Sequence, residues 1–187
     1  VISGNTTAQN GLWNVGSTWT SGSVPATDAN VIINHLVTLN VNVSVTDIAL
    51  NSTLTSESGQ ARQLTIKGNL TNNGTFTADN GTVSLSSAGT RQILGTAVTT
   101  FNNIETSTTV DFVDASTNRG TINGTFTIKS GGNVLTTSAP VYATGSTLKF
   151  DTGGSYYAGE AWYSNNPSGS AGVPKNVTIT NGTTLNF

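Results

Sequence analysis

Residues 63–77 read Gln-Leu-Thr-Ile-Lys-Gly-Asn-Leu-Thr-Asn-Asn-Gly-Thr-Phe-Thr, and this stretch contains the pattern that decides the fold. Leu64 and Ile66 alternate with polar residues, which is the spacing of a β-strand with one buried face. Asn73-Gly74 is a turn signal, because both residues readily adopt the backbone conformations of tight turns. A short strand followed by a polar turn is therefore the expected structural unit.

The same unit recurs along the whole chain. Pairs of apolar residues with this spacing occur at Val31/Ile33, Val37/Leu39, Val43/Val45, Ile48/Leu50, Val83/Leu85, Val110/Phe112, Phe126/Ile128, Leu148/Phe150, Val177/Ile179 and Leu185/Phe187. Turn signals such as Asn123-Gly124 and Gly131-Gly132 separate them. Many short strands joined by polar turns are typical of β-solenoids and of β-sandwiches or barrels.

The composition supports an all-β fold. The 187 residues include 34 Thr, 22 Asn, 21 Gly and 20 Ser, which together make up more than half of the chain. Residues that favour helices are scarce, so a mainly helical fold is excluded. The surplus of β-branched residues predicts strands, and the surplus of Gly and Asn predicts many tight turns.

An internal match favours the solenoid over the sandwich. Residues 65–71 and residues 121–127 share the pattern Thr-Ile-x-Gly-x-apolar-Thr, at an offset of 56. Three coils of roughly 18–20 residues fit that interval. We therefore expect an all-β, right-handed β-solenoid (a β-helix) with short coils of this length, and the alternative is a β-sandwich or jelly roll.

A second match suggests how the chain is organised. Residues 30–40, which we name copy 1, and residues 176–186, copy 2, have six identical positions at an offset of 146. Trp19 and Val24-Pro25 precede copy 1, and Trp162 and Val173-Pro174 precede copy 2. We therefore expect a cap or opening segment at 1–30, solenoid coils at 31–155 and the start of a second, similar unit at 156–187, with Asn176-Val177 in its first strand.

Charge and cysteine content limit the partners and the compartment. Only 9% of the residues are charged, and the formal net charge is −2, so phosphate-driven binding of nucleic acid is excluded. No apolar run approaches the roughly 20 residues that cross a bilayer, so we expect no membrane insertion. The chain has no Cys, which excludes disulfides and cysteine metal sites. A low-charge surface rich in Thr, Ser and Asn suits an exported, extracellular protein.

The sequence offers no set of residues for catalysis. His35 is the single histidine, and its place between two strand pairs favours a turn. Asp111 and Asp114 are the one close pair of carboxylates, and a spacing of three on a strand would point them to opposite sides. Asp79-Asn80-Gly81 reads as a turn more readily than as a calcium site. We therefore expect no enzyme activity, no catalytic residue, no metal and no cofactor.

Two groups of side chains are candidates for surface binding. Tyr156, Tyr157, Trp162 and Tyr163 could stack on glycans, or could cover the end of the apolar core as a cap. Thr-x-Thr tripeptides begin at residues 53, 75, 125 and 178. An ice-binding face would need one such pair in every coil, so the uneven spacing favours ordinary outward threonines.

Copy 2 carries the candidate segment for self-association. Val177, Ile179, Leu185 and Phe187 would lie at an open end of the solenoid, where backbone groups lack a neighbouring strand. A subunit that stacks end to end into an extracellular filament is therefore an alternative function.

A family resemblance adds an expectation about location. Trp13, Trp19, Gly22, Val24-Pro25, Asp28, Val31 and Ile33, in their spacing, resemble the opening segment of many secreted bacterial β-helix proteins. Residues 68–76, Gln92-Ile93 and residues 100–104 are similar to repeats in very large, adhesin-like cell-surface proteins of flavobacterial type. The resemblance implies export by a dedicated outer-membrane route, and it brings no catalytic residue.

Together these observations predict a non-enzymatic, extracellular structural or adhesive repeat segment of a bacterial cell-surface protein. Its expected partners are neighbouring repeat units or copies of itself, and further candidates are cell-surface glycans or abiotic surfaces. Besides the filament subunit, the alternative is an ice- or glycan-binding solenoid.

Overall fold

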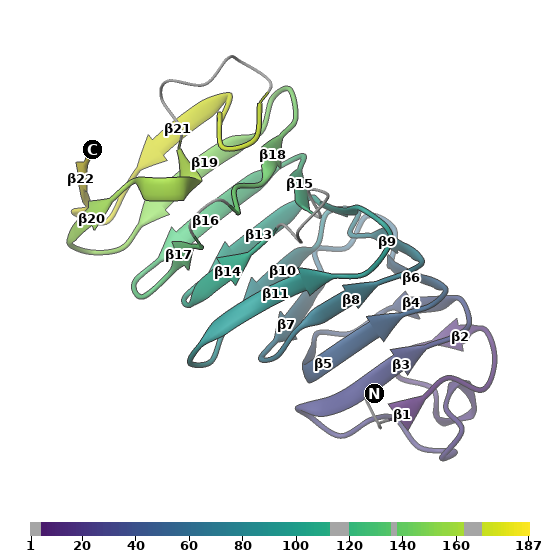
Figure 1. Cartoon of the computed structure of the whole chain (residues 1–187). Coiled ribbons are helices and arrows are strands. Elements are labelled where there is room, and N and C mark those ends of the chain that lie inside the picture. Colours follow the sequence, from purple (N-terminus) through teal and green to yellow (C-terminus); the bar gives the residue numbers. More distant parts are fainter. Residues whose placement is uncertain (1–4, 113–119, 136–137, 163–169) are drawn as a thin grey trace.

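The chain forms a β-solenoid of about six turns, in which strands stack coil upon coil along one axis (Figure 1). The computed structural model describes residues 5–112, 120–135, 138–162 and 170–187. All strand pairs in this part of the chain are parallel. The prediction of an all-β solenoid is therefore confirmed, and the sandwich alternative is wrong.

The first face of the solenoid is a long parallel sheet. In order along the axis it contains β7 (Gln63–Ile66), β10 (Thr82–Leu85), β13 (Asn103–Thr106), β16 (Thr125–Lys129), β19 (Thr147–Asp151) and β21 (Asn176–Ile179). Along β7, β10, β13 and β19, alternate residues are buried and half-buried, as the apolar pairs predict.

The second face contains β8 (Leu70–Asn72), β11 (Thr90–Leu94), β14 (Thr109–Asp111) and β17 (Asn133–Val134). One strand, β5 (Val43–Leu50), links it to the first face. Val43–Val45 pairs with β7 and Ile48–Leu50 pairs with β8. The apolar pairs Val43/Val45 and Ile48/Leu50 therefore belong to a single strand that serves two faces.

The third face is interrupted. Its first part contains β2 (Gly11–Leu12), β4 (Val37–Leu39), β6 (Thr53–Ser56) and β9 (Thr75–Thr77), and its second part contains β12 (Thr99–Phe101), β15 (Gly120–Ile122) and β18 (Val141–Tyr142). Within the residues that the structure describes, no backbone pairing joins β9 to β12.

Short elements complete the two ends. At the N-terminal end lie β1 (Asn5–Thr6), the 3-10 helix η1 (Gly16–Thr18) and β3 (Ala29–Ile33). At the C-terminal end lie β20 (Ser155–Tyr157), the 3-10 helix η2 (Gly159–Ala161) and β22 (Thr184–Asn186), and β20 pairs with β22. Trp13 and Trp19 are both buried, with 2% of each exposed, and their rings meet edge to face with centroids 5.0 Å apart.

The coils are slightly longer than expected. Leu64 pairs with Val83, which is 19 residues further on, and Val83 pairs with Ile104, which is 21 further on. The next two steps, to Phe126 and then to Leu148, are 22 residues each. Longer turns between short strands account for the difference.

The two segments that match at an offset of 56 both turn a corner of the coil, but they lie at different corners. Thr65 lies on the first face beside Ser84, whereas Thr121 lies on the third face beside Thr100. Both motifs place a glycine against the backbone of the preceding coil. A Cβ atom would lie 2.8 Å from Thr46 O at Gly68 and 2.5 Å from Asn102 O at Gly124, so only glycine fits.

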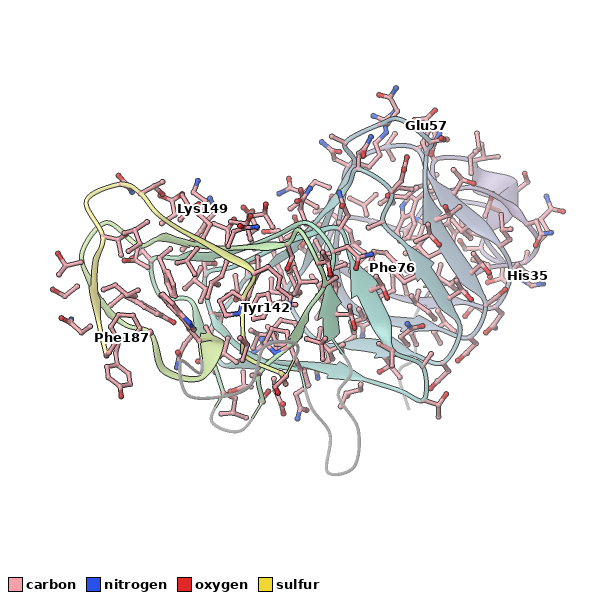
Figure 2. All side chains as sticks on the ribbon, turned by 90° about the horizontal axis from the view of Figure 1, so that it is seen from above. His35, Glu57, Phe76, Tyr142, Lys149 and Phe187 are labelled. Atoms are coloured by element: carbon pink, nitrogen blue, oxygen red, sulfur yellow. The ribbon has the colours of Figure 1, made fainter. Side chains whose placement is uncertain are left out.

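Aromatic rings fill the centre of the later coils. Phe101 and Phe112 meet at a centroid distance of 6.3 Å, and Phe112 and Phe126 meet edge to face at 5.5 Å. Tyr142 lies inside the solenoid (Figure 2) and donates a hydrogen bond to Ala161 O at 3.0 Å. Burial raises the pKa of the Tyr142 hydroxyl well above its usual value.

Asparagine and aspartate side chains link the coils at one corner. Asn30 Oδ1 accepts a hydrogen bond from Asp47 N at 3.1 Å, and Asp47 Oδ1 accepts one from Asn69 N at 2.7 Å. Asn69 Oδ1 in turn accepts one from Gln92 N at 2.9 Å. These side chains bind backbone donors where strand pairing lapses, which explains part of the asparagine content.

Candidate functional site

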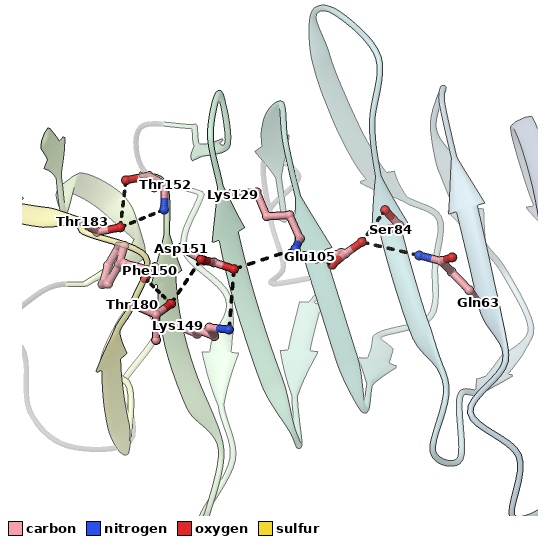
Figure 3. Close-up of polar contacts among 10 residues, drawn as sticks. All are labelled: Gln63, Ser84, Glu105, Lys129, Lys149, Phe150, Asp151, Thr152, Thr180 and Thr183. Carbon is pink, nitrogen blue, oxygen red and sulfur yellow. Dashed lines mark hydrogen bonds and ion pairs between the residues drawn. The ribbon is translucent and has the colours of Figure 1, made fainter. Parts of the chain in front are cut away.

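The first face carries a row of polar and charged side chains that crosses several coils (Figure 3). In register, Thr65, Ser84, Glu105, Thr127, Lys149 and Thr178 lie side by side. Each coil therefore presents its outward residues at the same height on the sheet. The result is a flat, hydroxyl-rich strip with a few charges.

The charges in this strip are balanced within it. Lys129 Nζ lies 3.4 Å from Glu105 Oε2 and 3.9 Å from Asp151 Oδ2, and Lys149 Nζ lies 3.6 Å from the same Asp151 oxygen. Ser84 Oγ donates to Glu105 Oε1 at 2.9 Å. Because these pairs are partly exposed, each stabilises the fold only weakly. The row orders the surface, and it offers neither a strongly positive nor a strongly negative patch.

A separate ion pair lies nearer to the N-terminal end. Lys67 Nζ lies 2.6 Å from Asp28 Oδ2, and Ser44 Oγ donates to Asp28 Oδ1 at 2.5 Å. The hydrogen bond from Lys67, and then that from Ser44, lowers the pKa of the Asp28 carboxyl below its usual value. This pair was not predicted, because only the coil register brings residues 28 and 67 together.

The threonine pairs do not form a continuous array. Thr53 and Thr55 lie directly beside Thr75 and Thr77 on the third face. The other two Thr-x-Thr tripeptides lie on the first face, where Lys149 separates Thr127 from Thr178. The structure thus divides the tripeptides between two faces, in agreement with their uneven spacing.

The residues considered for catalysis lie apart. His35 occupies the bend between β3 and β4, where Nδ1 lies 3.0 Å from Thr7 Oγ1. Asp79 lies in a turn closed by a bond from Gly81 N to Ala78 O, and its Oδ2 accepts a hydrogen bond from Gly59 N. Asp111 accepts one from Ser138 Oγ, whereas Asp114 lies outside the described residues. Among the described residues, no three His, Cys, Asp or Glu side chains group together as metal ligands would.

A groove lies at the interruption of the third face. Its volume is about 320 Å³, and it is lined by Phe76, Thr77, Ala78, Asp79, Thr100, Asn102 and Asn123. The side chains of Thr77, Thr100, Asn102 and Asn123 make no hydrogen bond to another residue in the described part of the chain. Sequence reasoning missed this groove, because it depends on the failure of β9 and β12 to pair.

The predicted aromatic group is spread over the C-terminal end. Tyr156 packs on Phe150 at 5.3 Å, and burial raises its pKa to about 12. Tyr157 is 66% exposed. The Trp162 ring meets Phe187 edge to face at 5.1 Å. Tyr163 lies outside the described residues. Stacking on glycans and capping of the core both remain predictions for this group.

The four apolar residues predicted for self-association form the outer coil. Val177 and Leu185 are partly buried, Ile179 is 49% exposed, and Phe187 is 70% exposed at the tip of the chain in Figure 2. Val177 and Ile179 pair with Leu148 and Phe150, which are fully buried. Self-association through this coil stays a prediction, as does the division of the chain at residues 30 and 156.

Comparisons with known proteins give no relative. The chain matches no protein-family model, and neither the curated proteins nor the solved structures contain a match to it. Among the described residues, no helix is long and apolar enough to span a membrane.

Proposed function

We propose that this chain is a non-enzymatic structural and adhesive repeat segment of an extracellular, bacterial cell-surface protein. The observation that carries the proposal is the first face, where successive coils place hydroxyl-bearing and a few charged side chains in register over six strands. A flat, repeated surface makes many weak contacts at once, and their combined strength grows with the number of contacts.

The chemistry of this surface suits contact with varied partners. Outward residues such as Thr65, Ser84 and Thr127 have short side chains, which lose little conformational entropy when a contact forms. The charged residues of the strip are largely paired with one another, so long-range attraction to one sign of charge is weak. Glycans and abiotic surfaces are the partners that this surface fits.

Adhesion can be measured with coated beads. Beads that carry the chain should be retained under flow on glycan-coated or mineral surfaces. A variant with Thr125→Lys and Thr147→Lys alters the first face, and Thr53→Lys with Thr55→Lys makes the matched change on the third face. We expect the first variant alone to lose retention. Retention no greater than that of an unrelated protein of similar charge would overturn the proposal.

Negative-stain microscopy with light scattering tests the structural part. Single short rods are the expected result for a repeat segment. Filaments would favour the alternative in which molecules of this chain stack end to end.

A second candidate function is supported by the groove at the third face. Free amide groups of Asn102 and Asn123, the hydroxyl of Thr100 and the buried ring of Phe76 suit a hydroxyl-rich ligand such as a saccharide. Binding to a glycan array should fall with Asn102→Ala and Asn123→Ala. Asn186→Ala, at the far end of the molecule, is the matched control. Equal binding by all three variants would exclude this groove.

A further inference from the structure

Among the described residues, no strand pairs with the outer edge of the last coil. In the described residues β21 pairs with β19 on one side, and β22 pairs with β20 on one side. The apolar residues of this edge, Ile179 and Phe187, are largely exposed, whereas the paired Leu148 and Phe150 are fully buried. A parallel edge with exposed apolar side chains is a template for a further strand.

The same arrangement occurs at the N-terminal end, where copy 1 forms β3 and β4. There β1 pairs with β3 and β2 pairs with β4, as β19 pairs with β21 and β20 with β22. In each case a 3-10 helix and a tryptophan precede the copy in the chain: Trp19 N donates to Gly16 O, and Trp162 N donates to Gly159 O. The two copies are therefore alike in both sequence and strand pairing.

Copy 1 shows what covers such an edge. β5 and β6 lie over it, with Ile48 beside Val31 and Leu50 beside Ile33. Ile33 O accepts a hydrogen bond from Asn51 N at 2.9 Å, and Leu39 O accepts one from Glu57 N at 3.0 Å. These contacts bury Ile33 completely.

We propose that the edge formed by β21 and β22 is a docking surface for a two-strand coil of the β5–β6 type. The incoming segment is extended and parallel, with aliphatic residues at the positions of Ile48 and Leu50. These residues pack on Val177 and Ile179, and the segment's backbone N–H groups bind Ile179 O and Leu185 O.

Asn176 supplies an additional acceptor for the incoming coil. It corresponds to Asn30, whose Oδ1 accepts a hydrogen bond from Asp47 N in β5. The Asn176 amide Nδ2 donates to Ser146 O at 3.0 Å, in the preceding coil. The Asn176 Oδ1 is then the atom that meets the backbone of the docked segment.

A peptide with the sequence of residues 42–58 is the direct probe, because it contains β5 and β6 of this chain. Added to the intact chain, it should slow hydrogen exchange at the Val177 and Ile179 amides at least tenfold. The control peptide carries Ile48→Asp and Leu50→Asp and should have no effect. Ile179→Asp in the chain should abolish the protection, and circular dichroism checks that this variant is folded.

A covalent extension tests the same contacts without the cost of ordering a free peptide. Residues 42–58 are appended after Phe187, which corresponds to Val41. Protection of β21 by the appended segment, and not by its Asp-bearing version, supports the proposal even if the free peptide binds weakly. Unchanged exchange in both experiments would overturn it.

Self-association gives the other decisive result. If the unmodified chain forms dimers or filaments that Ile179→Asp abolishes, another molecule of this chain occupies the edge and the proposal is overturned. The inference rests on the proposed structural role, but the two fail separately, because bead retention concerns the first face and amide protection concerns the edge.

Discussion

Copy 1 and copy 2 share six of their eleven residues but lie in two different environments. Val31 and Ile33 of copy 1 are completely buried, whereas Val177 is partly buried and Ile179 is 49% exposed. Each copy pairs with a strand of the preceding coil, but among the described residues only copy 1 is also covered by a following coil, in which β5 pairs with Val31 and Ile33. In a solenoid, the local sequence determines where a strand forms, and the neighbouring coil determines how much of its apolar surface is buried.

The two copies also lie on different columns of the solenoid. Val31 pairs with Ile48, which continues to Leu70 and Ile93 on the second face. Val177 pairs with Leu148, which continues to Phe126 on the first face. The repeated unit is therefore a local module of strand, 3-10 helix, tryptophan and strand, and it can begin on more than one face.

The largest expected contrast is between Ile33→Ala and Ile179→Ala. The first change leaves a cavity in the core and should lower the free energy of unfolding by about 2–5 kcal/mol. The second removes a half-exposed side chain and should cost less than about 1 kcal/mol. Urea denaturation of both variants gives the comparison, and equal losses would show that copy 2 is covered in solution.

A second contrast concerns the two tryptophans. Trp19 Nε1 donates to Trp13 O at 2.9 Å in the buried cap. Trp19→Phe leaves that carbonyl without its donor and should cost about 1–3 kcal/mol. Trp162→Phe retains a ring beside Phe187 and should cost less than about 1 kcal/mol. Thermal unfolding of the two variants measures the difference, and a larger loss at Trp162 would contradict it.

A smaller contrast is expected between Asn30→Ala and Asn176→Ala. Asn30 accepts the backbone N–H of the following coil, so its loss should cost about 0.5–1.5 kcal/mol. Asn176 is exposed, and in the described part of the chain its side chain binds the preceding coil, so its loss should stay within about 0.5 kcal/mol. In the chain extended by residues 42–58, the Asn176→Ala cost should rise toward that of Asn30→Ala.

The smallest contrast is a pH effect confined to the N-terminal end. The pKa of Asp28 is lowered by Lys67 and Ser44, so its carboxylate stabilises the fold at pH values above its unfolded pKa. That contribution is lost as the pH falls through the lowered folded value. Copy 2 has Pro174 at the corresponding position and no carboxylate.

Hydrogen exchange between about pH 5 and about pH 2 can detect this effect. After correction for intrinsic rates, the β3 amides should lose protection with acid, and Asp28→Asn should flatten that dependence. The β21 amides should not respond to the Asp28→Asn substitution. A uniform response of both copies would point to a global charge effect.

Much of the fold could be predicted, because strand alternation is a local property. Leu64/Ile66, Val83/Leu85 and Leu148/Phe150 all lie on strands with the expected buried residues. The continuity of β5 was missed, since the three-residue step from Val45 to Ile48 interrupts the alternation of buried residues and so resembles the gap between two strands. The coil length was slightly underestimated, because the 56-residue match compares two different corners.

The candidate surfaces were harder to predict than the strands. The row from Glu105 through Lys129 to Asp151 depends on steps of 24 and 22 residues, which become recognisable only when the register is known. The groove beside Phe76 arises where β9 and β12 do not pair, and no residue type in the sequence predicts that these strands stay unpaired. Side-chain contacts between coils thus require the register, which the apolar pattern leaves undetermined.

The one-sided attachment of the last coil has a mechanical consequence. Each coil is bonded chiefly to the coils before and after it, so a force applied through the C-terminus would load β21 and β22 first. The coils would then peel away in sequence, while the Trp13–Trp19 contact secures the opposite end. A docked coil would move the point of first rupture outward, so a chain of such units would yield stepwise under tension.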